Sequence, residues 1–132
     1  MATIRFAAPQ LLVDDLERAL GFYEDRLGFA RDFVYEGFYA SVSRDGATLH
    51  LKCAPKTEAD RAHRVAGDHV DAYLEVDDAR ALHDEVARRG ATIKQPVIEQ
   101  AWRNRDFQVT DPDGYILCFS QPLDTTDQEE DE

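Results

Sequence analysis

Residues 13–29 have the sequence VDDLERALGFYEDRLGF, and residues 76–91 have the sequence VDDARALHDEVARRGA. Each stretch starts with Val-Asp-Asp after an apolar run and reaches a glycine near its end. Between these points apolar residues recur every three or four positions, which is typical of one buried helix face. They are Leu16, Ala19, Leu20, Tyr23 and Leu27 in the first stretch, and Ala79, Leu82 and Val86 in the second. The repetition predicts two copies of one folding module.

Both predicted helices have end residues that favour helix starts and stops. Asp14 is predicted to cap the first helix, with Glu17 three residues later as the second half of a capping box. Either Asp77 or Asp78 is expected to cap the second helix. The glycine near the end of each stretch is predicted to stop its helix.

Each predicted helix is preceded by one strand and followed by three. Strands are predicted within residues 3–13, 29–36, 37–46 and 47–53, and again within residues 69–76, 91–100, 103–110 and 115–121. The turn sequences RDG at 44–46 and DPDG at 111–114 separate neighbouring strands. This order is βαβββ twice, an α+β chain. We expect one domain over residues 1–122, with modules at 1–53 and 68–122, a linker at 54–67 and an acidic, disordered tail at 123–132.

Alternation of residue types predicts which sheet face meets the helix. In the strand at 69–76, the apolar residues alternate with polar ones and are expected under the helix. The apolar set is Val70, Ala72, Leu74 and Val76, and the polar set is His69, Asp71, Tyr73 and Glu75. Likewise Leu49 and Leu51 oppose Thr48, His50 and Lys52, while Tyr115, Leu117 and Phe119 oppose Ile116, Cys118 and Ser120. The helix-free face of each sheet is then left to pack on another surface or to enclose a ligand.

Composition and charge narrow the class of protein. The chain has 132 residues, 43% of them apolar, and no apolar run near the roughly 20 residues that span a bilayer. Two cysteines do not make a disulfide framework, and no signal peptide is recognisable, so we expect a cytoplasmic protein. The net charge is −12, and it is still −6 without the last ten residues, because 21 acids then face 15 bases. An acidic body argues against nucleic acid as a partner.

Several of these stretches, in this order, resemble the vicinal oxygen chelate superfamily, which includes glyoxalases, extradiol dioxygenases and bleomycin-resistance proteins. They are VDDLERALGFYEDRLGF, DGATLHL, YLEVDDARAL and WRNRDFQVTDPDGYILCF, and they span most of residues 4–121. Pro9, RLGFARDFV at 26–34 and Trp102 are most similar to the bleomycin-resistance branch. The resemblance implies a glyoxalase-like fold, in which two modules form a curved mixed sheet with a concave ligand cavity. It also implies a homodimer in which modules or N-terminal arms pair across chains.

The resemblance also identifies where a metal would bind. Metal-dependent members draw ligands from four strand positions, which correspond here to Ala8, His50, Asp71 and Cys118. Ala8 has no ligating atom, and the other three differ from the His, Gln or Glu that is usual there. We therefore expect no cofactor. If a divalent metal does bind, it is expected near His50, Asp71 and Cys118, since these residue types can each hold zinc.

Aromatic and acidic residues dominate the expected ligand wall. The candidate ligand-binding residues are Asp32, Phe33, Phe38, Tyr39, His50, Asp71, Tyr73, Glu75, Trp102 and Cys118. Flat apolar side chains beside carboxylates suit a planar cation through stacking and ion pairing. Phe29, Phe107 and Phe119 are instead expected in the core. Related sequences often have glycine after the tryptophan, whereas Arg103 follows Trp102 here.

These observations favour a binding protein over a catalyst. The chain has no phosphate-binding glycine loop, nucleophile elbow or zinc-finger spacing. The leading interpretation is non-catalytic sequestration of a small cationic aromatic antibiotic, of bleomycin type, or of a metabolite. The alternatives are a metal-dependent lyase, isomerase or dioxygenase of the same superfamily, and a domain without chemistry that serves as a partner or sensor subunit.

Overall fold

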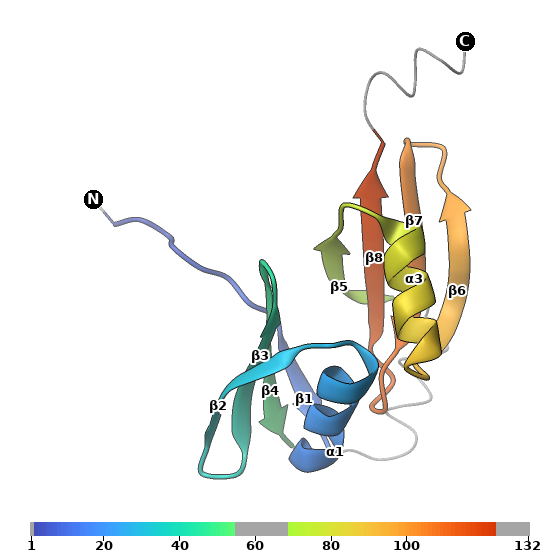
Figure 1. Ribbon diagram of the computed structural model, residues 1–132. Coiled ribbons are helices and arrows are strands. Elements are labelled where there is room, and N and C mark those ends of the chain that lie inside the picture. Colours follow the sequence, from blue (N-terminus) through green and yellow to red (C-terminus); the bar gives the residue numbers. More distant parts are fainter. Residues whose placement is uncertain (1, 55–68, 124–132) are drawn as a thin grey trace.

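Two four-stranded sheets, each with its own helical segment on one face, make up the computed structural model (Figure 1). The structure describes residues 2–54 and 69–123. The first module contains β1 (Gln10–Val13), α1 (Leu16–Gly21), the π-helical turn η1 (Phe22–Arg26), β2 (Ala30–Tyr35), β3 (Tyr39–Arg44) and β4 (Ala47–Cys53). The second contains β5 (Val70–Glu75), α3 (Ala79–Arg88), β6 (Thr92–Glu99), β7 (Asn104–Thr110) and β8 (Ile116–Pro122). The predicted α+β class and the duplicated βαβββ order are confirmed.

Both sheets have the same strand arrangement. The order is β1-β4-β3-β2 in the first sheet and β5-β8-β7-β6 in the second. In each module the first strand runs parallel to the last, and the other pairs are antiparallel. The eight strands therefore form two separate mixed sheets. The predicted linker and tail, except residues 54 and 123, lie outside the described residues, so the domain boundaries stay a prediction.

The helices begin at aspartates, but not all at the predicted ones. Asp15, in extended conformation, caps α1 and accepts from the backbone N–H of Arg18 at 3.1 Å. The prediction of Asp14 as the cap was wrong, because the Asp14 backbone N–H instead donates to the second module. Asp78 caps α3 in the same way as Asp15 caps α1. Of the two alternatives for the second helix, the structure selects the residue directly before the first helical one.

The helix-bearing face of each sheet forms the hydrophobic core. All five residues of the first predicted stripe are buried, as are Ala79 and Val86 of the second. Phe29, Phe107 and Phe119 are core residues, as expected. No helix in the described ranges is long and apolar enough to cross a bilayer.

The start of β5 departs from the predicted alternation. Ala72 and Leu74 are buried, but Val70 is 43% exposed and lies opposite Ile116, on the helix-free side. The reason is a β-bulge between Val70 and Ala72, which shifts the side-chain alternation by one residue. Asp71 occupies the bulge, and its carboxylate accepts the Ile116 backbone N–H at 2.9 Å. The prediction that placed Val70 under the helix was therefore wrong.

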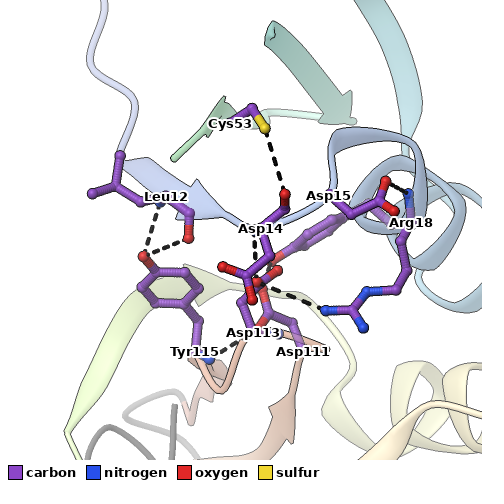
Figure 2. Close-up of polar contacts among 9 residues, drawn as sticks. Leu12, Asp14, Asp15, Arg18, Cys53, Asp111, Asp113 and Tyr115 are labelled. Atoms are coloured by element: carbon purple, nitrogen blue, oxygen red, sulfur yellow. Dashed lines mark hydrogen bonds and ion pairs between the residues drawn. The ribbon is translucent and has the colours of Figure 1, made fainter. Parts of the chain in front are cut away.

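A polar seam joins the two modules where the DPDG turn meets the start of α1 (Figure 2). The Asp14 backbone N–H donates to Asp113 Oδ1 at 3.0 Å, and the Tyr115 hydroxyl bonds both the N–H and the carbonyl of Leu12. Nearby, the buried Tyr23 hydroxyl donates to Asp111 Oδ2 at 2.7 Å. These contacts bridge about 90–100 positions of sequence, so they fix one module against the other.

A salt bridge forms a second connection between the modules. Arg44, at the end of β3, donates to both carboxylate oxygens of Glu85 on α3, at 2.8 and 2.9 Å. The same guanidinium donates to the Leu27 carbonyl, and Arg89 also pairs with Glu85. Hydrogen bonds from Arg44 are the first cause of the lowered pKa of Glu85, and they raise the pKa of Arg44 in turn.

Candidate functional site

The helix-free face of the first sheet holds a group of aromatic rings. Phe33 and Tyr39 lie nearly parallel with ring centroids 6.4 Å apart, and His50 meets both rings edge-on at 6.2 and 5.5 Å. The Tyr39 hydroxyl and His50 Nδ1 are 2.9 Å apart. At the edge of this group, Phe38 contacts Tyr35. We call Phe33, Tyr35, Phe38, Tyr39 and His50 the aromatic face.

Local backbone features of β2 bring these rings together. A bulge between Arg31 and Phe33 lets the side chains of two consecutive residues, Asp32 and Phe33, lie on the helix-free side. The chain then reverses at residues 35–38, where Glu36 and Gly37 both have positive φ and the Phe38 N–H donates to the Tyr35 carbonyl. Such a turn keeps the aromatic residues of β2 opposite those of β3.

Asp32 lies on this side but its carboxylate is already used. Its Oδ1 accepts the Ser43 hydroxyl and its Oδ2 accepts the Ser41 hydroxyl, both at 2.8 Å. The side chain is also exposed to solvent. A charge in that position is screened by water. Asp32 therefore lies on the helix-free side of the first sheet, but it is a weak anchor for a cation.

The helix-free face of the second sheet has a different character. Its side chains are mostly amides and hydroxyls surrounding one carboxylate, and we call them the amide face: Gln95, Gln100, Asn104, Asp106, Gln108 and Ser120. Gln95 and Gln100 both donate to Asp106 Oδ1, at 3.0 and 3.1 Å. Asn104 donates to the hydroxyls of Tyr73 and Ser120.

The amide face was not predicted from the sequence, although the sequence contains a signal for it. In residues 103–110, Asn104, Asp106 and Gln108 alternate with Arg105, Phe107 and Val109. Applied to this strand, the alternation rule would have placed the first three on the helix-free side. The position of Gln95 needed more than the rule, because register shifts on either side of it re-aim its side chain.

Three of the predicted site residues lie on the helix-free side of β5 and β8. Tyr73 is 59% exposed and lies opposite Cys118, while Glu75 lies opposite Ser120. Cys118 is buried, and burial, followed by the charge of nearby Asp106, raises the pKa of its thiol to about 11. A thiol with so high a pKa is protonated at neutral pH and is a poor nucleophile.

Trp102 lies at the tip of the β6–β7 hairpin and is 66% exposed. The Arg103 N–H donates to the Gln100 carbonyl, and the Gln100 N–H donates to the Asn104 carbonyl at 2.7 Å. Arg103 has φ of 67°, the left-handed conformation that closes such a three-residue loop. This conformation favours glycine, which gives a physical reason for the glycine that often follows the tryptophan in similar sequences.

The structure thus divides the ten candidate residues between two sheets. Asp32, Phe33, Phe38, Tyr39 and His50 gather on the first sheet, and Tyr73, Glu75 and Cys118 lie on the second, with Asp71 in its bulge and Trp102 at its hairpin tip. A crevice of about 890 Å³ lies between the modules, but it is lined mainly by helix-side residues and includes only Asp71, Tyr73 and Glu75 of the ten. The crevice and the predicted ligand wall are therefore largely different surfaces.

Comparison with known proteins agrees with this architecture. The model of the Glyoxalase/Bleomycin resistance protein/Dioxygenase superfamily matches residues 5–119. The chain belongs to this superfamily. A curated relative, the bleomycin resistance protein of Geobacillus stearothermophilus, is 25% identical over 126 residues, which cover 87% of this chain and 95% of that protein.

Solved structures of the superfamily extend the comparison. The bleomycin-binding protein from bleomycin-producing Streptomyces verticillus, complexed with copper(II)-bleomycin, is 30% identical with a TM-score of 0.68, covering 94% of this chain and 99% of that chain. The bleomycin resistance determinant encoded on the transposon Tn5 is 22% identical with a TM-score of 0.74, covering 90% and 98%. The second likeness supports the fold alone.

Some members of the superfamily bind a metal, but the corresponding residues of this chain do not fit one. His50 Nδ1 contacts the Tyr39 hydroxyl, the Asp71 carboxylate accepts a backbone N–H, and the Cys118 thiol has a raised pKa. Ala8 offers no ligating atom. Within residues 2–54 and 69–123, no three His, Cys, Asp or Glu side chains gather into a metal-binding group.

Proposed function

We infer that this protein binds and sequesters a small cationic aromatic antibiotic of the bleomycin type, or a metabolite of that chemistry, without transforming it. The observation that supports this function best is the aromatic face, on which Phe33 and Tyr39 lie nearly parallel beside His50. Exposed flat rings on a sheet face without a helix offer a stacking surface for a planar ligand. Relatives named for bleomycin resistance and bleomycin binding support the same ligand class.

The proposed binding unit is a homodimer. In one chain the aromatic and amide faces belong to different sheets, and pairing with a second copy would bring the aromatic face of one chain opposite the amide face of the other. The N-terminal arm, residues 2–9, extends away from β1 (Figure 1), with Ile4 91% exposed and Phe6 61% exposed, although the Phe6 ring lies 6.1 Å from that of His50 and the Pro9 carbonyl accepts the His50 N–H. Two exposed apolar residues on an extended arm favour pairing with another chain.

Sedimentation at micromolar concentration tests the dimer. We expect the double variant Ile4→Asp/Phe6→Asp to raise the dimer Kd at least tenfold, because charge would replace the apolar contacts of the arm. The control Thr3→Asp/Ala7→Asp adds the same charge on the alternate side of the arm and is expected to leave the dimer intact. A monomeric parent protein would contradict this part of the proposal.

The enzyme alternative has less support. A metal-dependent lyase, isomerase or dioxygenase needs an open metal site, and the side chains of His50, Asp71 and Cys118 are engaged elsewhere or protonated. Elemental analysis of protein purified without chelator decides between the two functions. A stoichiometric transition metal that disappears in His50→Ala would favour the enzyme over the binding protein.

The two free thiols, Cys53 and Cys118, are consistent with the cytoplasm as the proposed compartment.

Titration with metal-free bleomycin tests the ligand assignment. Trp102 is the only tryptophan, so its fluorescence reports on the β6–β7 hairpin tip alone. We expect a saturable change in emission, because the indole would exchange water for the ligand. Calorimetry should then give a loss of about 1–3 kcal/mol in binding for Trp102→Ala, the range for an aromatic anchor.

Trp102→Phe is the matched control, because it keeps a flat ring and should keep most of the affinity. Equal binding by Trp102→Ala and the parent would exclude stacking on the indole. If bleomycin changes neither the emission nor the calorimetric signal, the antibiotic assignment is wrong and the family assignment is unaffected.

A further inference from the structure

The amide face contains a buried carboxylate that is only half used. Asp106 is 5% exposed and lies on the helix-free side, opposite Ser120 of β8. Both of its amide donors, Gln95 and Gln100, bond the same oxygen, Oδ1. Its Oδ2 accepts no hydrogen bond from the described part of the chain, and no Lys, Arg or His there forms an ion pair with Asp106. Oδ2 is not one of the fully enclosed atoms of the described residues that lack a partner, so it is open to solvent and available to a donor group of a ligand.

The bonds to Oδ1 also fix the direction of the carboxylate. Gln95 approaches from β6 and Gln100 from the start of the hairpin loop, so the group is held from one side. On the same helix-free face, Asn104 links the hydroxyls of Ser120 and Tyr73 into a polar row. β7 thus presents the Asp106 carboxylate as a hydrogen-bond acceptor, and the nearby amide and hydroxyl groups can make further hydrogen bonds to a ligand.

Asp32, on the first sheet, differs from Asp106 in its hydrogen bonds and in its exposure. Both of its oxygens accept hydroxyl hydrogen bonds, and its side chain is exposed. Coulomb attraction is several times stronger for a buried charge than for one in water. Of the two aspartates on helix-free faces, Asp106 therefore has both the free oxygen and the environment that strengthen an ion pair.

We propose that Asp106 is the cation-binding residue of the ligand site and that it accepts an amidinium, guanidinium or ammonium group of the ligand through Oδ2. The inference rests on the proposed function in taking the helix-free faces as the ligand side. It assigns the cationic group to the second sheet, while the aromatic face of the first sheet holds the flat part of the ligand. Asp32 and Glu75, expected from the sequence to pair with the cation, are secondary to it.

The test compares benzamidine with benzamide, two flat probes of nearly the same shape, of which only benzamidine is charged. Ligand-observed NMR titration of the parent is expected to give a Kd at least tenfold lower for benzamidine, in line with a charge-assisted hydrogen bond. Asp106→Asn keeps the side-chain shape and removes the charge. It should bring the ratio of the two Kd values to about one, mainly by weakening benzamidine binding.

Glu99→Gln is the matched control. It removes the same charge from the same hairpin, but Glu99 is on the opposite face, where it pairs with Arg105. This variant should keep the preference for benzamidine. The proposal is overturned if the parent has no preference, if Asp106→Asn retains it, or if Glu99→Gln loses it as completely as Asp106→Asn does.

A second measurement needs no variant and covers the case in which Asp106→Asn does not fold. Benzamidine added to the isotope-labelled parent should shift the backbone amides of Asp106 and Ser120 more than benzamide does. Shifts confined to other parts of the chain would overturn the proposal. Because neither probe is an antibiotic, these results are independent of the bleomycin titration: a cation site without bleomycin binding would refute only the antibiotic assignment, and bleomycin binding without a cation preference would refute only the role of Asp106.

Discussion

The helix-free faces of the two sheets have the same topology and opposite chemistry. The aromatic face presents rings around His50, whereas the amide face presents Gln, Asn and Ser side chains around Asp106. On the helix-bearing sides the two modules are alike, since both bury aliphatic and aromatic residues against a capped helix. The two modules therefore share the apolar pattern that builds the core and differ on the helix-free face.

Under the proposed function, this difference would let one fold bind a ligand with two kinds of group. Aromatic rings attract a cation only modestly at an exposed site, and a polar surface with one buried carboxylate stacks poorly. Two identical faces would repeat one of these properties. Two different faces allow a planar part and a cationic part of one molecule to be recognised together.

The largest predicted effect is on the free energy of unfolding, and it distinguishes a ring on the core side of a sheet from a ring on the proposed ligand side. Phe107 is fully buried and stacks on Phe119 with centroids 5.1 Å apart, whereas Phe33 is 47% exposed. Phe107→Ala should lower the free energy of unfolding by about 3–5 kcal/mol through cavity formation. Phe33→Ala should lower it by less than about 1 kcal/mol, as at other surface positions. Urea unfolding of both variants measures the contrast.

The Phe33 variant should instead fail in ligand titrations. An unfolding cost for Phe33→Ala as large as that for Phe107→Ala would show that this ring belongs to the hydrophobic core or to a permanent subunit contact. That result would contradict the proposal that the aromatic face binds the ligand.

Much of this architecture follows from patterns along the chain, because they are local. The helical stripes, the hairpin turns and the duplicated order depend on spacing within about 20 residues, and the structure confirms them. The positions of Phe33, Tyr39 and His50 on one face follow from strand alternation combined with hairpin pairing.

The errors occur where a distant segment decides the local structure. Asp14 does not cap α1, because its N–H bonds Asp113, which is 99 positions away. Val70 is exposed because Asp71 bonds the backbone of β8 and maintains a bulge. The proposed role of Asp106 depends on the side-chain amides of Gln95 and Gln100 and on its burial. Neither property can be predicted from the residues next to Asp106 in the sequence.

The second prediction concerns the seam that holds the two faces in their relative orientation. Asp111 is buried there, and burial raises the pKa of its carboxyl from 3.8 to about 6, despite hydrogen bonds from Tyr23, Asp113 and Tyr115. Since the folded pKa is above the unfolded one, the folded state binds more protons between these values. The stabilisation is complete below about pH 3.8 and is lost as the pH rises through 6. Its upper limit is on the order of 3 kcal/mol.

Unfolding measured from pH 5 to pH 7 tests this dependence. The parent should lose stability as the pH rises, and Asp111→Asn should not show that component. The range avoids Glu24 and Glu85, whose lowered pKa values produce a loss of stability only in more acidic solution. A parallel pH dependence in the two proteins would mean that Asp111 is not the group responsible.

The smallest predicted effect lies in the turn that orders the aromatic face. Glu36 has φ of 53° and Gly37 has φ of 72°, and a turn with two positive φ values favours Asn-Gly over Glu-Gly. Glu36→Asn should therefore raise the free energy of unfolding by about 0.5 kcal/mol, because asparagine enters this conformation at lower cost. Gly37→Ala, in the same turn, should lower it by about 1–2 kcal/mol, since a Cβ there is strained even though no neighbouring atom blocks it. Chemical denaturation of the two variants measures whether each raises or lowers the free energy of unfolding.

If both variants destabilise the protein equally, the turn is held by the Phe38 contacts and not by its backbone preference. If the signs are as predicted, a ligand titration of Glu36→Asn should give unchanged or tighter binding, because a better-ordered hairpin presents Phe33 and Tyr39 with less loss of freedom.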